Sequence, residues 1–116
     1  MNNQIKELEA KNIQVRIYHY RRVFDGYNSD NTKFYSEELL TDIRNQKRQN
    51  DIQSKGGRTY CILTFPDGKT FTGEARCSIE DAFVRKRGVA KAVGRAIQAA
   101  KQASQGIDLN DVFDKN

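Results

Sequence analysis

The sequence predicts an α+β domain in which a small antiparallel three-stranded sheet packs against a long C-terminal helix and shorter helices. Three observations support this prediction. Residues 13–23 alternate between apolar and polar side chains, residues 58–77 do the same around a turn, and residues 79–103 repeat apolar residues at helical spacing. Alternation with a period of two is typical of half-buried strands, and a 3.6-residue repeat is typical of an amphipathic helix. With 116 residues, we expect the chain to form one domain spanning residues 1–116.

The first half of the chain is expected to contain two short helices and one strand. Residues 3–11 are polar and helical in character, residues 13–23 form the strand, and a polar loop follows it. The second helix is expected to begin at Ser36, because serine is a favoured N-cap residue and two glutamates follow it in the first turn. A loop over residues 50–58 then leads into the next strands.

Residues 58–77 predict a β-hairpin that turns at Pro-Asp-Gly. Proline presets φ for the first turn residue, and glycine supplies the positive φ that a bulge after the turn requires. This turn places Leu63 opposite Phe71 and Cys61 opposite Gly73. The register puts the apolar side chains of both strands on one face of the sheet.

Two cysteines lie on that apolar face of the predicted hairpin. Cys77 lies four residues beyond the partner of Cys61, which is about 13 Å at strand rise. This separation is too long for a disulfide bond. We therefore expect two reduced thiols.

The long helix is expected to cover residues 79–103, with Asp81 as a capping-box acid after an N-cap at Ser78. On a helical wheel Lys86 falls within the apolar stripe, one turn after Phe83. A lysine in that position must extend to solvent or meet an anion. The apolar stripe contains Ile79, Ala82, Val89, Val93, Ala96, Ile97 and Ala100.

Small residues are unusually frequent in the same helix. Gly88 and Gly94 each weaken a helix by about 1 kcal/mol relative to alanine. Their presence predicts close approach by another backbone or by a ligand. Together with the alanines between residues 90 and 100, they favour a tightly packed helix–helix dimer.

The formal net charge of +5 predicts an anionic partner, which could be a nucleotide, DNA, RNA or a membrane surface.

No apolar run approaches the roughly 20 residues of a membrane span. The N-terminal residues are polar, unlike a signal peptide. The expected location is therefore the cytosol. The final residues, 107–116, form an acidic tail.

Two further stretches suggest an anion-binding surface. The outward positions of the first strand hold Arg16, Tyr18, Tyr20 and Arg22. Such a row can stack bases and neutralise phosphates, or it can form an oligomer interface. Gly56 and Gly57 could present backbone N–H groups to an anion, or they could form a plain loop before the strand.

Catalytic motifs are not recognisable in the sequence. His19 has the inward parity of its strand and is expected to be a satisfied core residue. No Cys/His cluster has metal-ligand spacing, and no phosphate-binding glycine loop is present. We therefore expect neither catalysis nor a bound metal or cofactor.

The chain resembles the phage-encoded Thoeris anti-defence sponge proteins over residues 12–103. The resemblance rests on YHYRR, on KGGRT, on the hairpin and on EARCSIEDAFVRKRGVAKAVGRA. It implies binding of a cyclic ADP-ribose-type signal without cleavage, which would starve a bacterial immune effector in the host cytosol. It also implies dimers or larger oligomers, and some family members bind cyclic oligonucleotides at separate sites.

For such a ligand, Phe83 is expected to stack on the base, and nearby cations are expected to contact the pyrophosphate. The candidate ligand-binding residues are Arg58, Phe83, Arg85, Lys86, Arg87, Lys91, Arg95, Gly56, Gly57 and Thr59. The first alternative is a small basic DNA- or RNA-binding protein that uses the Arg/Tyr row and the long helix. A second alternative is an assembly module without a ligand.

Overall fold

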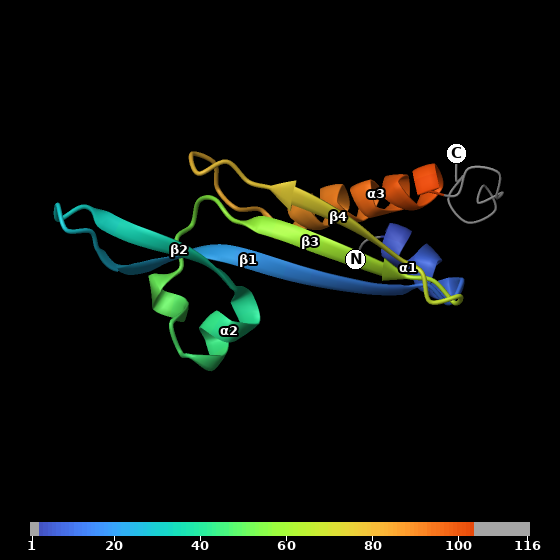
Figure 1. Ribbon diagram of the computed structural model, residues 1–116, viewed down its shortest axis with the longest axis horizontal. Coiled ribbons are helices and arrows are strands. Elements are labelled where there is room, and N and C mark those ends of the chain that lie inside the picture. The colour runs from blue at the N-terminus through green and yellow to red at the C-terminus, as the bar shows by residue number, and fades with distance from the viewer. Residues whose placement is uncertain (1–2, 104–116) are drawn as a thin grey trace.

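The structure, a computed structural model, describes residues 3–103 and confirms the α+β class (Figure 1). The elements are α1 (Asn3–Ala10), β1 (Gln14–Tyr27), β2 (Lys33–Leu39), α2 (Leu40–Asn45), a 3-10 turn (Gln49–Asp51), β3 (Arg58–Thr64), β4 (Thr70–Arg76) and α3 (Arg85–Ala103). The predicted acidic tail at 107–116 lies outside the described residues.

The antiparallel sheet has four strands in the order β2-β1-β3-β4, so the prediction of three strands was wrong. The additional strand, β2, pairs with the second half of β1, placing Leu39 opposite Tyr20 and Tyr35 opposite Phe24. Strand β1 is correspondingly longer than predicted and reaches Tyr27. Pairing satisfies the backbone groups along β1, which a loop in place of β2 would have left open at the edge.

The prediction that a helix begins at Ser36 was also wrong, because Ser36 lies within β2. Its hydroxyl donates a 2.6 Å hydrogen bond to the Glu38 carboxylate instead of accepting one from a helical N–H. The helix that follows, α2, has six residues, and its N-cap residue Leu39 makes no side-chain cap. Tertiary pairing of the strand has therefore overridden the local helix signals.

The hairpin formed by β3 and β4 has the predicted register. Leu63 pairs with Phe71 and Cys61 pairs with Gly73. The turn also forms as predicted, since Gly68 has φ +88° and the Phe65 N–H donates to the Lys69 carbonyl at 2.9 Å. The predicted apolar face of the hairpin faces the core.

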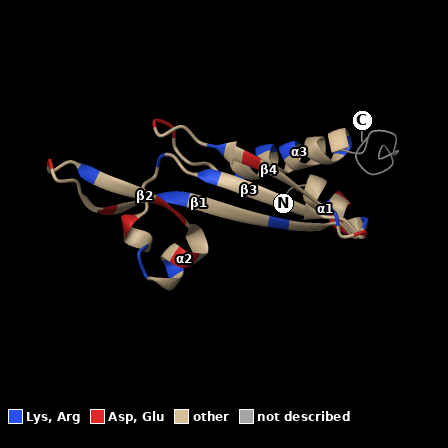
Figure 2. Ribbon diagram, viewed as in Figure 1, with Lys and Arg blue, Asp and Glu red and all other residues tan. Residues whose placement is uncertain are grey.

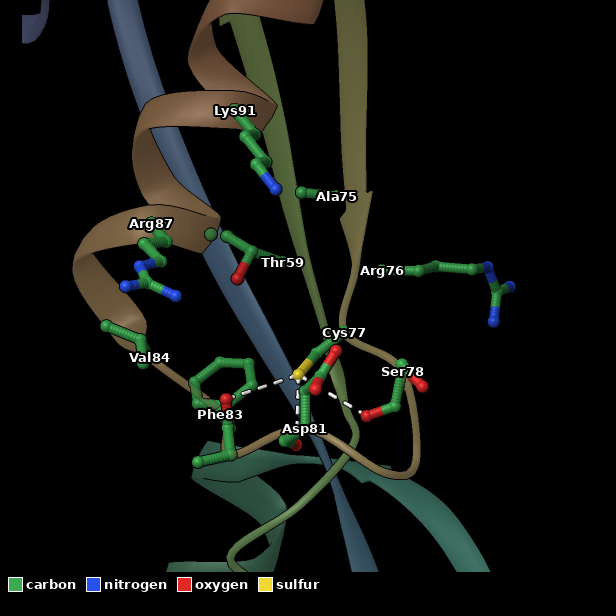
Figure 3. Close-up of a pocket in the computed structure, with 12 residues that line it drawn as sticks. Thr59, Ala75, Arg76, Cys77, Ser78, Asp81, Phe83, Val84, Arg87 and Lys91 are labelled. Atoms are coloured by element: carbon green, nitrogen blue, oxygen red, sulfur yellow. Dashed lines mark hydrogen bonds between the residues drawn. The ribbon is translucent and has the colours of Figure 1, made fainter.

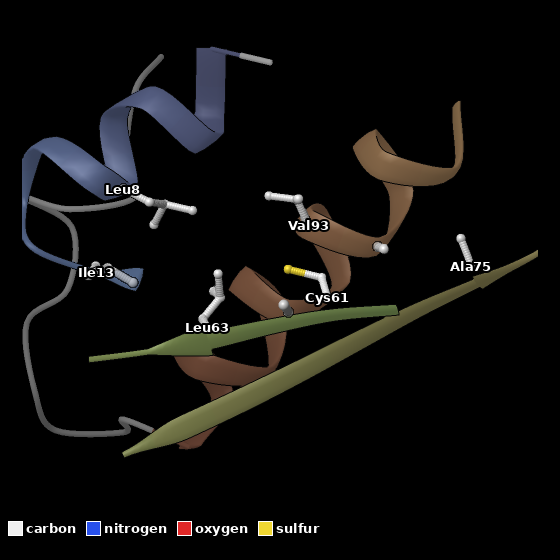
Figure 4. Packing of buried hydrophobic residues seen from close by; sticks show 8 residues of the cluster. Leu8, Ile13, Cys61, Leu63, Ala75 and Val93 are labelled. Carbon is white, nitrogen blue, oxygen red and sulfur yellow. The ribbon is translucent and has the colours of Figure 1, made fainter. Parts of the chain in front are cut away.

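Helices α1 and α3 cover this apolar face and bury the core between them and the sheet (Figure 4). The buried cluster contains Leu8, Ile13, Cys61, Leu63, Ala75, Ala92, Val93 and Ala96. Gly73 lets α3 approach β4 closely, because a Cβ at this position would collide with the backbone of Ala92 and Ala96.

The predicted role of the small residues on α3 needs correction. Ala92, Ala96 and Ala100 are fully buried, and Gly88 packs on the Thr59 side chain of β3. The close approach that these residues permit is therefore between α3 and the sheet of the same chain. Gly94 is different, because a Cβ there would meet no atom within 4 Å.

Helix α3 begins at Arg85, so the prediction of a helix from residue 79 with a cap at Ser78 was wrong. The preceding residues pair with the loop before β3 instead. The Phe83 N–H donates to the Ser54 carbonyl at 2.8 Å, and Lys55 and Ala82 form an isolated β-bridge. These bonds hold residues 82 and 83 extended, and Ile79 lies in the turn closed by the Asp81 N–H and the Ser78 carbonyl. Ile79 is 64% exposed and is not part of a helical stripe.

Candidate functional site

A pocket of about 330 Å³ lies where the connection from β4 meets the first turns of α3 (Figure 3). Strand β3 contributes Thr59 to its wall, and α3 contributes Gly88 and two cations. The lining residues are Thr59, Ala75, Arg76, Cys77, Ser78, Asp81, Ala82, Phe83, Val84, Arg87, Gly88 and Lys91. The pocket is thus built from segments that the three-dimensional fold brings together.

The β4–α3 connection is held in a tight loop around Cys77. The Cys77 N–H donates to the Gly57 carbonyl at 2.8 Å. Its Sγ atom faces the carbonyl oxygens of Asp81 at 3.3 Å and Ala82 at 3.4 Å, and a thiol can donate to only one of them at a time. These contacts anchor the connection from both sides, so the shape of the pocket depends on the residue at position 77.

Two cations on successive turns of α3, Arg87 and Lys91, extend toward the pocket (Figure 3). Neither forms an ion pair within residues 3–103. Asp81 contributes a carboxylate to the lining, and Arg76 extends away from the pocket and pairs with Glu74 at 3.2 Å. Figure 2 shows the cations recurring along α3. Arg87 and Lys91 are therefore available to an anion.

Phe83 borders the pocket, but its ring is already packed against the protein. The Arg21 guanidinium lies over the ring with its carbon 4.3 Å from the centroid. His19 meets the ring edge at a centroid distance of 5.7 Å, and a Cβ on Gly57 would come within 3.0 Å of it. This packing leaves less of the ring available for base stacking than the sequence suggested.

Behind the pocket wall, the His19 side chain is 6% exposed, and its Nδ1 lies 3.0 Å from the Thr59 hydroxyl. Its Nε2 has no hydrogen-bond partner within the described residues, so the predicted satisfied core histidine is satisfied at one nitrogen. Burial is the largest cause that lowers the His19 pKa, followed by the positive charge of Arg85; together with weaker effects they bring it to about 4. His19 is therefore neutral at pH 7.

We expect this buried histidine to make the protein less stable as the pH falls from 6.5 to about 4. In that range the unfolded chain binds a proton at His19 and the folded chain does not, so the free energy of unfolding falls by up to about 1.4 kcal/mol per pH unit. Urea denaturation of wild type and His19→Gln at pH 6.5, 5.5 and 4.5 measures this slope. Equal slopes for the two proteins would contradict the prediction.

The structure places four of the candidate residues, Thr59, Phe83, Arg87 and Lys91, at the pocket. Arg85 and Lys86 line a separate groove between α1 and α3. Lys86 therefore does not lie one helical turn from Phe83 in an apolar stripe, because the helix begins at Arg85.

The remaining candidates do not line the pocket. Arg58 lies on the opposite face of the sheet and pairs with Glu37 at 2.6 Å and Glu74 at 2.7 Å. Arg95 donates to the Glu74 carbonyl at 2.6 Å. The Gly56 N–H donates to the Asp81 carbonyl at 3.1 Å. The Gly56 N–H is therefore already bonded within the chain and does not contribute to the predicted anion nest.

Sequence reasoning missed Cys77, Ser78 and Asp81 as lining residues. Asp81 and Ser78 were interpreted as helix-capping residues, and Cys77 was interpreted as a core thiol. The pairing of residues 81–83 with residues 54–56 brings Asp81 to the pocket, and the bond from the Cys77 N–H to the Gly57 carbonyl holds Cys77 there. The sequence between the end of β4 at Arg76 and the start of α3 at Arg85 contains no local pattern that predicts this pairing.

The two thiols differ sharply in exposure. Cys61 is fully buried, and burial raises its pKa to about 11, whereas Cys77 is partly exposed in the pocket wall. Because the thiolate is the reactive form, we expect a disulfide reagent at pH 8 to titrate one thiol in the folded protein and two after denaturation. The Cys77→Ser variant should lose the fast reaction. Two thiols reacting equally fast in the folded state would contradict this assignment.

Within the described residues no helix is long and apolar enough to cross a membrane, and no group of three or more His, Cys, Asp or Glu residues could hold a metal ion. Comparison with family models, with curated proteins and with solved structures finds no match for this chain.

Proposed function

We propose that this protein binds a cyclic ADP-ribose-type nucleotide in the pocket beside α3 and holds it without cleaving it. The observation that carries the proposal is the pair of unneutralised cations, Arg87 and Lys91, at a pocket of about 330 Å³. A pyrophosphate is a compact dianion, and cations that face it can form charge-assisted hydrogen bonds. The resemblance to the Thoeris anti-defence sponge family supports the choice of ligand class.

The pocket volume lies at the lower end of the roughly 300–1,000 Å³ typical of small-molecule sites. In the proposed complex the pocket encloses the pyrophosphate and the adjoining ribose, and the base lies at the rim near Phe83 and Val84. A homo-oligomer of the kind the resemblance implies would place a second copy over the open side. Retention of the intact signal would then prevent activation of a bacterial immune effector.

Isothermal titration calorimetry with cyclic ADP-ribose and its isomers tests this proposal. We expect a submicromolar Kd for at least one isomer. The affinity should depend less on salt than that of a nucleic-acid binder with 6–10 phosphate contacts, which loses roughly 10³–10⁵-fold between about 50 and 200 mM salt. The bound ligand should also slow the reaction of Cys77 with a disulfide reagent. No heat and no protection with any isomer would rule out the proposed ligand class.

Holding the ligand without cleavage requires a separate measurement. The protein is incubated with the bound isomer and then denatured by heat, and the released molecules are identified by mass spectrometry. We expect the cyclic isomer to return intact. Linear ADP-ribose that accumulates in proportion to the amount of protein would show hydrolysis and contradict this proposal.

A further inference from the structure

The side of the sheet opposite α1 and α3 has no buried side chains on β1, β3 and β4. We call this surface the open face. It comprises the outward-pointing side chains of the four strands, and it contains four of the five tyrosines in the sequence. These are Tyr18, Tyr20, Tyr35 and Tyr60. All four are partly exposed, and a surface so rich in tyrosine is suited to a partner that stacks on aromatic rings.

The tyrosines are adjacent across neighbouring strands. Tyr18 on β1 pairs directly with Tyr60 on β3, and Tyr20 follows on the same face of β1. Tyr35 on β2 pairs with Phe24 of β1, and their ring centroids are 6.2 Å apart. Neighbouring strands lie about 4.8 Å apart, so Tyr18, Tyr20 and Tyr60 form one group of rings, and Tyr35 with Phe24 forms a second group beyond the Arg22–Glu37 pair.

Arginines lie among these rings. The Arg58 guanidinium stacks on Tyr20 with its carbon 4.0 Å from the centroid, and Arg22 stacks on Tyr35 at 4.6 Å. Arg58 is neutralised by two glutamates, but Arg16 and Arg22 form no ion pair within residues 3–103. These two arginines therefore remain available to phosphates at either end of the tyrosine row of β1.

The charge of the open face favours an anionic occupant. The face carries Arg16, Arg22, Arg58 and Arg76 against Glu37 and Glu74. Its aliphatic side chains are Ile62 on β3 and Leu39, which pairs with Tyr20 from β2, whereas the core of a protein–protein interface is largely apolar. Rings interspersed with cations and almost no aliphatic residues are typical of surfaces that bind single-stranded nucleic acid.

We propose that the open face binds single-stranded DNA or RNA independently of the pocket beside α3. Bases stack on Tyr18 and Tyr60, and the backbone phosphates contact Arg16 and Arg22. Four-stranded sheets with helices on one face and exposed aromatic residues on the other bind single-stranded RNA in this way. Stacking tolerates any base, so the proposed binding is insensitive to sequence.

The first test uses the wild-type protein and needs no variant. The chain has no tryptophan, so its intrinsic fluorescence comes from tyrosine, and four of the five tyrosines lie on the open face. Titration with oligo(dT) and oligo(U) of about twelve nucleotides should quench this fluorescence. Unchanged emission up to an oligonucleotide concentration of about 10⁻⁴ M would overturn the proposal.

The second test measures anisotropy of the same oligonucleotides labelled with fluorescein. We expect a wild-type Kd between about 10⁻⁶ and 10⁻⁴ M. Tyr18→Ala and Tyr60→Ala should each weaken binding by about 5- to 150-fold, and Tyr18→Phe, which keeps the ring, should not. Arg16→Gln should lower the log–log salt slope by about 1.

The matched control is Phe34→Ala, which removes an exposed aromatic ring that points to the other side of β2. It should leave the oligonucleotide Kd unchanged, as should Lys91→Gln in the pocket and an excess of cyclic ADP-ribose. Loss of binding in these controls but not in the tyrosine variants would refute the open-face site. If Tyr18→Ala instead changes only the sedimentation mass of the protein, the face is a self-association surface and the proposal fails.

Discussion

Replacing Gly73 by alanine should lower the free energy of unfolding by about 3 kcal/mol or more. A Cβ at this position would collide with the carbonyl oxygen of Ala92 and the amide nitrogen of Ala96, and it would lie 2.9 Å from the carbonyl carbon of Arg95. These are backbone atoms of α3, so relief requires the whole helix to move away from β4 and open the core. Thermal melting followed by circular dichroism should show a fall in Tm on the order of 10 °C.

Gly94→Ala is the matched control on the helix itself. A Cβ at residue 94 would meet nothing within 4 Å, and alanine favours a helix by about 1 kcal/mol over glycine. We expect this variant to melt at or above the temperature of wild type. If Gly73→Ala and Gly94→Ala melt at the same temperature, α3 does not approach β4 as closely as the structure places it.

Replacing Arg87 and Lys91 together by glutamine should weaken binding of the cyclic ADP-ribose isomer by more than about 100-fold. Each hydrogen bond to a charged group contributes roughly 1.5–3 kcal/mol, so the loss of two corresponds to at least about 3 kcal/mol. Both side chains are exposed and form no ion pair within the described residues, so stability should change little. Calorimetry and thermal melting of the same samples separate the two effects.

A second double variant, Arg85→Gln with Lys86→Gln, removes the same charge from the groove that faces α1. Its affinity should stay within a few-fold of wild type, because only long-range electrostatics change. Equal losses of affinity in both double variants would show that binding depends on the net charge of the protein and not on contacts in the pocket. A loss confined to Arg85 and Lys86 would move the site to the α1–α3 groove.

The sequence by itself determined the features that depend on local patterns. The alternation around Pro-Asp-Gly set the register in which Leu63 pairs with Phe71, because a slip of one residue would turn the apolar face of the hairpin to solvent. The helical repeat also identified the body of α3, and the spacing of Arg87 and Lys91 placed both cations on one side of it. The sequence named both among ten candidate residues, but only the tertiary structure places them at the pocket.

Only the tertiary structure decided the features in which distant segments satisfy each other's backbone groups. Lys33–Leu39 carries helix-start signals but forms a strand, because β1 offers it a row of hydrogen-bonding partners. Residues 81–83 stay extended for the same reason, since residues 54–56 bind their N–H and carbonyl groups. Long-range backbone pairing cannot be read from the local sequence pattern of either segment. This pairing brings Asp81 to the pocket. It also delays the start of α3 to Arg85, so that Lys86 does not lie one helical turn from Phe83.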